Sequence, residues 1–172
     1  MKFNDWLQTI SPEITNDALW QMTLYRQALF LGELGWYDAT KLLSDRRTVR
    51  LADQLYRAVG KISSNIAEGY SKASGKDQAR FYEYALGSAR EARDWYYKGR
   101  HILGEEVFLH RSRLLVNIIR QLLNLIPRHR GHKIAEEPTP YEPYPIDQLL
   151  QIIPMPTDTK YAIRNTEYDP NT

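Results

Sequence analysis

The segment Ser63–Tyr70 places an amide and a carboxylate at a spacing that could support chemistry. Asn65 and Glu68 are three residues apart, so on a helix both side chains share one face. One hypothesis makes Glu68 a general acid or base, but the sequence supplies neither a pocket nor a clear polar partner for it. The favoured hypothesis is structural, with Asn65 or Glu68 bonded to Arg90 or Tyr82 of the next helix. We therefore predict no catalytic residue and a structural polar network of Asn65, Glu68 and Arg90.

Two further patterns are weak candidates for sites. The stretch 69–77 resembles a phosphate-binding loop, but five residues rather than four separate its glycines and Asp77 replaces the Ser or Thr that would hold magnesium. Lys72 and Lys76 could still contact a backbone phosphate. His129 and His132 lie among cations with no acidic ligand nearby, so we predict no metal site and no cofactor.

The basic residues in the middle of the chain are the stronger candidates for a binding site. Interleaved Trp95, Tyr96 and Tyr97 offer faces on which unpaired bases could stack. Salt-sensitive contacts to phosphates need only such cations, and a ring of subunits would repeat each of them. The predicted nucleic-acid-binding residues are Lys72, Lys76, Arg80, Arg93, Lys98, Arg100, Arg111, Arg113, Arg120, Arg128, Arg130 and Lys133.

The charges are segregated along the chain. Residues 41–133 hold 19 Lys and Arg against 9 Asp and Glu, whereas the remaining residues hold 4 against 12. This asymmetry indicates a polyanion-binding body with acidic ends. The alternative is an ordinary solvated helical surface, because Lys and Arg are common on helices.

Four amphipathic segments must position these side chains. Apolar residues recur every three or four positions over about 16–45 and 48–71, and again after Gly75 and after Gly104. Thr15, Asn16 or Asp17 is the candidate N-cap of the first helix, and Pro127 is expected to end the fourth. The third helix has a seam of small residues that favours close packing, namely Phe81, Ala85, Ser88, Ala92, Trp95, Gly99 and Ile102. The pattern predicts an all-α fold, an antiparallel up-and-down four-helix bundle.

The segments on either side of this bundle differ from it. We expect three parts: a lead-in over 1–14, the bundle over 15–130 and a proline-rich, mostly irregular C-terminal tail over 131–172. One short ordered piece is possible at 146–153, where it could cover a groove on its own subunit, a neighbour or a partner protein. The alternative is an incidental apolar patch in the tail.

Length and composition set outer bounds. The 172 residues suit one domain with tails, and the sequence has no cysteine. We find no apolar run of signal-peptide or membrane-spanning length, so a cytoplasmic protein is expected.

The middle of the chain resembles bacterial four-helix-bundle proteins encoded in intervening sequences of large-subunit ribosomal RNA genes. The resemblance rests on 54–58 (QLYRA), 62–70 (ISSNIAEGY), 81–82 (FY) and 85–91 (ALGSARE), and it covers about residues 16–130. Ser63 replaces a proline that is usual in the family. The resemblance implies a ring-shaped homo-oligomer, typically a pentamer, with a basic surface suspected of binding RNA or DNA. A related branch is the accessory variability protein of diversity-generating retroelements, which works with a reverse transcriptase.

Together these observations predict a non-catalytic, oligomeric nucleic-acid-binding accessory protein, with RNA as the favoured nucleic acid and a reverse transcriptase as a candidate partner. The alternative is a structural or protein-interaction module whose C-terminal tail docks a partner without binding nucleic acid.

Overall fold

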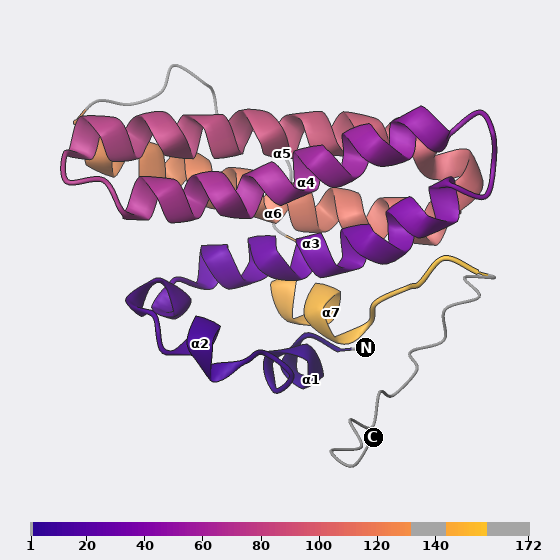
Figure 1. The fold of residues 1–172 in the computed structure, drawn as a ribbon, viewed down its shortest axis with the longest axis horizontal. Coiled ribbons are helices and arrows are strands. Elements are labelled where there is room, and N and C mark those ends of the chain that lie inside the picture. The colour runs from indigo at the N-terminus through magenta and orange to yellow at the C-terminus, as the bar shows by residue number, and fades with distance from the viewer. Residues whose placement is uncertain (1, 132–143, 158–172) are drawn as a thin grey trace, which may run out of the picture.

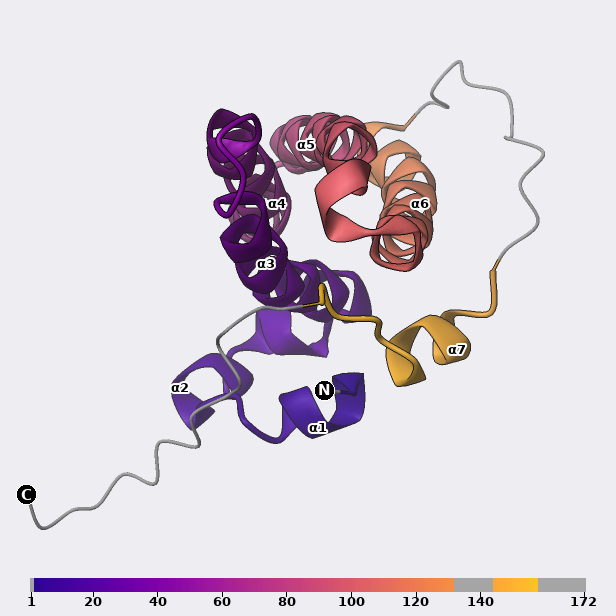
Figure 2. The same cartoon turned by 90° about the vertical axis from the view of Figure 1, so that its right-hand side faces the viewer.

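Four long helices lie side by side around one core (Figures 1 and 2). They are α3 (Thr23–Leu42), α4 (Val49–Tyr70), α5 (Gly75–Leu103) and α6 (Glu105–Arg130). The computed structural model describes residues 2–131 and 144–157, and all regular structure within them is helical. The prediction of an all-α fold is therefore confirmed. α5 makes the most extensive contacts, with α4 on one side and α6 on the other, so it joins these two helices.

Helix α4 follows the predicted stripe closely. Its apolar residues Leu55, Val59, Ile62 and Ile66 are fully buried at spacings of three or four, which is one face of a helix. The predicted range of 48–71 is thus confirmed to within one residue at each end.

The first predicted helix, about 16–45, is wrong at its start. Residues Ala18–Gln21 form the 3₁₀ helix η1, which Asp17 caps by accepting a hydrogen bond from the Leu19 amide at 2.8 Å. Met22 is then extended, with φ −78° and ψ 106°, and α3 begins at Thr23. The local Asp17 bond competes with a continuous α-helix, and the change of direction separates η1 from α3.

The small-residue seam of α5 is confirmed as a packing surface. Ala85, Ser88, Ala92 and Gly99 are all buried. A Cβ atom at Gly99 would lie 3.2 Å from Leu42 Cδ2 of α3, which is tighter than ordinary van der Waals contact. Small side chains therefore let α5 approach its neighbours closely.

Helix α6 does not end at Pro127, contrary to the prediction, but continues to Arg130. Proline removes one N–H and clashes with the turn before it, yet only three helical residues follow it. Gly131 then ends the helix with φ +82°, and its amide donates to the Pro127 carbonyl at 2.9 Å. Residues after a proline can thus complete one last turn when a left-handed glycine closes it.

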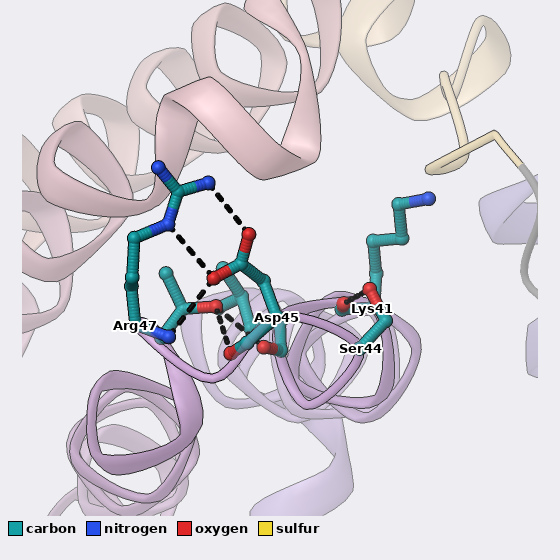
Figure 3. Close-up of polar contacts among 6 residues, drawn as sticks. Lys41, Ser44, Asp45 and Arg47 are labelled. Atoms are coloured by element: carbon teal, nitrogen blue, oxygen red, sulfur yellow. Dashed lines mark hydrogen bonds and ion pairs between the residues drawn. The ribbon is translucent and has the colours of Figure 1, made fainter.

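The α3–α4 turn is held by its own polar side chains (Figure 3). Arg47 donates from Nε to Asp45 Oδ1 at 2.9 Å and from Nη2 to Oδ2 at 2.6 Å. These bonds lower the pKa of Asp45 to about 2. The buried Thr48 hydroxyl donates to the Leu42 carbonyl, which ties the start of α4 to the end of α3.

The N-terminal residues add to the core rather than serving only as a lead-in. They form α1 (Phe3–Leu7) and α2 (Pro12–Thr15), and Pro12 occupies the first turn of α2. The rings of Phe3 and Trp6 lie 5.1 and 5.0 Å from that of Phe30 in α3. Their burial extends the core beyond the four long helices.

A C-terminal segment, residues 144–157, returns to the body of the protein, and we call it the strap. It contains α7 (Ile146–Gln151), which contacts α6 and α1 (Figure 2). Leu149 is buried at 4% exposure. The segment expected to be ordered, 146–153, overlaps α7, which packs on helices of its own chain. The other tail positions, 132–143 and 158–172, lie outside the described residues.

Candidate nucleic-acid interface

One end of the molecule collects several of the predicted cations. The α4–α5 turn meets the last turn of α6 there, so closely that a Cβ atom at Gly75 would lie 2.7 Å from the His129 carbonyl oxygen. The rings of Tyr82 and His129 are 5.4 Å apart, edge to face. Arg130 reaches back to Glu83 of α5, with Nη2 and Oε2 3.0 Å apart. We call this surface the basic end, and its cations are Lys72, Lys76, Arg80, Arg128 and Arg130.

Three of these cations have acidic neighbours. Lys72 contacts Glu68 at 3.2 Å, Arg80 contacts Asp77 at 3.5 Å and Arg130 contacts Glu83. All three ion pairs are substantially exposed, and water weakens such pairs. Lys76 and Arg128 form no hydrogen bond or ion pair with any residue that the structure describes. The basic end therefore keeps two unneutralised cations for a polyanion.

The other predicted cations of α5 lie further along that helix. Arg93 is exposed. Lys98 pairs with Asp94 at 2.5 Å and lies 4.3 Å from the centre of the Trp95 ring. Arg100 lies 3.9 Å from the centre of the Tyr97 ring. These cation–π contacts leave the guanidinium and ammonium charges at the surface.

On α6 the prediction holds less well. Arg113 lies 4.1 Å from the Tyr144 ring of the strap, and Arg120 is only half-buried and thus still reachable. Lys133 lies outside the described residues.

The prediction that Arg111 binds nucleic acid is wrong. Its side chain is 0% exposed, and so is that of Asp38, with which it pairs through Nε and Oδ2 at 2.7 Å. A second bond joins Nη2 to Asp38 Oδ1 at 3.1 Å. Burial alone would lower the pKa of the Arg111 guanidinium, but the Asp38 carboxylate more than reverses this, so the pKa is raised. A fully paired, buried arginine has no face left for a phosphate.

Two more side chains join this ion pair. The Tyr96 hydroxyl donates to Asp38 Oδ2 at 2.8 Å, and burial raises the pKa of that hydroxyl well above 10. Arg111 Nη1 lies 2.8 Å from His110 Nδ1. Because arginine donates only, Nδ1 must accept, and the His110 proton must be on Nε2. We call Asp38, Tyr96, His110 and Arg111 the buried network.

The strap closes the buried network. His110 Nε2 lies 2.7 Å from the Leu149 carbonyl oxygen, to which the tautomer above donates. Arg111 Nη2 also donates to the Pro154 carbonyl at 3.1 Å. Burial, with a smaller effect of the Arg111 charge, lowers the pKa of His110 to about 4. The network thus binds backbone carbonyls of the protein's own tail.

The predicted structural polar network of Asn65, Glu68 and Arg90 is wrong for Glu68. Its side chain is 53% exposed and pairs with Lys72 one turn later on the same helix. Asn65 is half-buried. The buried polar contact between distant helices is made instead by Asp38 of α3 and Arg111 of α6. The link of Asn65 to Arg90 stays a prediction.

Sequence reasoning missed Asp38 and His110, although one signal was present. Asp38 interrupts the apolar stripe of α3 formed by Leu31, Leu34 and Leu42, which are fully buried. A carboxylate on such a stripe needs a buried cation. Of the aromatic residues expected to stack bases, Tyr96 is fully buried, whereas Tyr97 is 53% exposed.

Two further findings concern the part of the chain that the structure describes. No three His, Asp or Glu side chains gather there as metal ligands. None of the helices described is long and apolar enough to cross a membrane.

Comparisons with known proteins identify the family of this fold. The model of the family described as 23S rRNA-intervening sequence protein matches residues 22–124, more than half of the chain. Neither the curated proteins nor the solved structures compared include a match. The matched range starts at the extended residue before α3 and ends in the penultimate turn of α6.

Proposed function

The chain belongs to the 23S rRNA-intervening sequence protein family, and from this premise we propose that it is a non-catalytic, oligomeric accessory protein that binds RNA. The name of the family associates it with ribosomal RNA, which is compatible with RNA as the ligand. The location proposed for this protein is cytoplasmic.

The observation that carries the proposal is the basic end. The close approach of Gly75 to the His129 carbonyl brings cations from two separate helix ends together. Lys76 and Arg128 lack acidic partners among the described residues. Unneutralised cations release counterions from a phosphate backbone when they bind it, which gives salt-dependent affinity.

The non-catalytic part of the proposal is supported by the state of the buried polar groups. His110, Tyr96 and Asp38 are the kinds of residue that catalyse proton transfers. Each is bonded to another protein group and shielded from solvent. Groups held in this way stabilise packing rather than meet a substrate.

We propose that α3–α6 form the antiparallel up-and-down bundle of the family, and that copies associate through an exposed apolar face of α3 and α4. We call this surface the α3–α4 face, and it consists of Trp36, Leu43, Val49 and Tyr56, exposed by 44–58%. The rings of Trp36 and Tyr56 are 5.9 Å apart. Clustered exposed apolar side chains mark protein contacts. A pentamer is the ring size that the family resemblance implies.

The proposed protein partner is a reverse transcriptase of a diversity-generating retroelement. This part rests on the family resemblance of the sequence alone, and co-purification of the two proteins from cells that express both would test it.

A second candidate function is a protein-interaction module without nucleic-acid binding. The α3–α4 face favours it, because that face suits a protein partner as well as a second copy. The strap favours it less, since the inward side of α7 is already occupied by its own chain.

The two candidates are separated by titrating the whole protein with fluorescent single-stranded RNA and with duplex DNA at increasing NaCl. RNA binding predicts affinity that falls steeply with salt. An interaction module predicts no affinity at low salt for either ligand.

A further inference from the structure

A cleft of about 340 Å³ opens between the start of α3 and the last turns of α6. This volume is at the lower end of the range for small-molecule sites, so it suits one compact ligand. Arg128 of the basic end lines one side of it. The cleft and the proposed phosphate-binding surface are therefore continuous.

The walls of the cleft combine apolar and amide groups. Met22 and Leu24 line the α3 side, and Leu125 lines the α6 side. Gln121 and Asn124 project from α6 at the same place. Apolar walls accommodate the flat faces of a nucleobase, while carboxamides carry both the donor and the acceptor that a base edge requires.

One of these amides is held in place from below. Gln121 Nε2 donates to Gln27 Oε1 at 2.6 Å, and Asn117 Nδ2 donates to the same oxygen at 3.2 Å. Gln27 is only 4% exposed. With its Nε2 engaged, Gln121 keeps its carbonyl oxygen for a ligand, already oriented by a buried residue.

Arg128 lines the cleft and Arg26 is bonded to Thr23 of its lining, and neither guanidinium pairs with a carboxylate of the described residues. Arg128 has no hydrogen-bond or ion-pair partner among the described residues. Arg26 donates from Nη2 to Thr23 Oγ1 at 3.2 Å at the rim, and its Nε is buried with no partner. Positive charge beside an apolar, amide-lined cleft matches a phosphate attached to a base.

We propose that this cleft holds one unpaired nucleotide of single-stranded RNA, a role that rests on the RNA binding proposed above. The base lies between the Met22 and Leu125 side chains, the amides of Gln121 and Asn124 bond its edge, and Arg128 binds the adjoining phosphate. In a duplex, stacking and pairing keep the base out of the cleft. The site therefore makes this protein prefer single-stranded to double-stranded RNA.

The test fills the cleft without changing its charge. Asn124 is exposed and Asn124→Trp places a large ring in the opening, whereas Asn4→Trp on α1 is the matched control at an exposed asparagine away from it. The probes are a fluorescent 12-nucleotide single-stranded RNA, the duplex of the same sequence, and adenosine monophosphate. Thermal melting checks that each variant is folded, and Asn124→Ala replaces Asn124→Trp if the larger side chain unfolds the protein.

We expect Asn124→Trp to weaken single-stranded binding about tenfold, the order of one lost hydrogen-bonded contact, and to leave duplex binding and the Asn4→Trp control unchanged. Asn124→Ala should weaken the same ligand by a smaller factor. If the wild type binds RNA, two results would contradict a nucleotide site in the cleft. They are an equal loss of affinity for both RNA forms, and an unchanged affinity for single-stranded RNA. Adenosine monophosphate that binds as tightly as the 12-mer would also overturn it, since the site would then serve free nucleotides. A wild type with no salt-dependent affinity for any RNA would instead overturn the proposed function, and the cleft with it.

Discussion

Asp38 and Arg111, 73 positions apart in the sequence, form an ion pair that is entirely removed from solvent. The pair links α3 to α6, the first and last of the four long helices. Tyr96 of α5 donates to the same carboxylate, so three helices meet at one charge. The strap adds the Pro154 carbonyl as a further partner of Arg111. Each polar group of the network is hydrogen-bonded to another. The buried charges are therefore paired only while the three helices keep this arrangement.

Breaking this ion pair from one side should be costly. Arg111→Met leaves the Asp38 carboxylate buried without its cation, and we expect it to lower the free energy of unfolding by about 3–5 kcal/mol. The double variant Asp38→Leu/Arg111→Met should be more stable than Arg111→Met. Urea denaturation followed by circular dichroism measures both, and equal stability of the single variant and the wild type would contradict the burial described here.

Stability should depend on pH through His110. Its pKa is about 4 in the folded protein against 6.5 as its ordinary value, so between these values the unfolded chain binds the extra proton. The free energy of unfolding should therefore be highest above pH 6.5 and should fall as the pH drops from 6.5 toward 4. The charges of Arg111 and Arg113 act on the ring, and protonated His110 would turn a second donor toward Arg111. We would measure the free energy of unfolding by urea denaturation between pH 4 and 7. It should change less with pH in His110→Gln than in the exposed control His101→Gln.

The approach of the α4–α5 turn to α6 is tested by a pair of glycines. Gly75→Ala puts a Cβ atom against the backbone of His129, which must shift, and we expect a loss of about 1–3 kcal/mol. Gly87→Ala, at a position on α5 where nothing lies within 4 Å, should instead stabilise by about 0.5–1 kcal/mol. Thermal melting of the two variants should thus shift in opposite directions, and a shift in the same direction would show that the basic end is not tightly closed.

The α3–α4 face should control assembly. Trp36→Glu introduces a charge among exposed apolar side chains, and it should reduce the oligomer to smaller species while helicity is retained. Light scattering after size-exclusion chromatography measures the mass directly. Tyr84→Glu, an equally exposed aromatic residue on α5, is the control. A monomeric wild type, or an unchanged mass of Trp36→Glu, would show that the α3–α4 face does not mediate assembly.

The sequence predicts the parts of the fold that depend on local periodicity. The apolar stripe of α4 and the small-residue seam of α5 are both predictable from the sequence, because the spacing of apolar residues alone determines which helix face is buried. The ends of helices were less predictable. Asp17 and Gly131 act through single hydrogen bonds or a left-handed backbone, and these local effects decide where α3 begins and where α6 ends.

The candidate site was predictable in composition but not in arrangement. Arg111 and Arg113 look alike in the sequence, two positions apart, yet one is buried against Asp38 and the other lies at the surface over Tyr144. Only the packing of α3 on α6 distinguishes them. The grouping of Lys76 with Arg128 likewise depends on Gly75 meeting His129, a contact between segments more than 50 positions apart. Periodicity carries no information on such long-range contacts.

The central claim is that the basic end binds RNA through unpaired cations, and the salt dependence of affinity tests it most directly. Lys76→Gln/Arg128→Gln removes two unneutralised charges, while Arg47→Gln/Arg57→Gln removes the same charge from residues already paired with Asp45 and Asp53. Fluorescence titration with single-stranded RNA over a NaCl series should give a log–log slope that is shallower by about 1.4 in the first variant, since each single-strand phosphate contact contributes about 0.7. The second variant should keep the wild-type slope. Equal slopes in all three proteins, or a wild type that shows no salt dependence, would contradict the account.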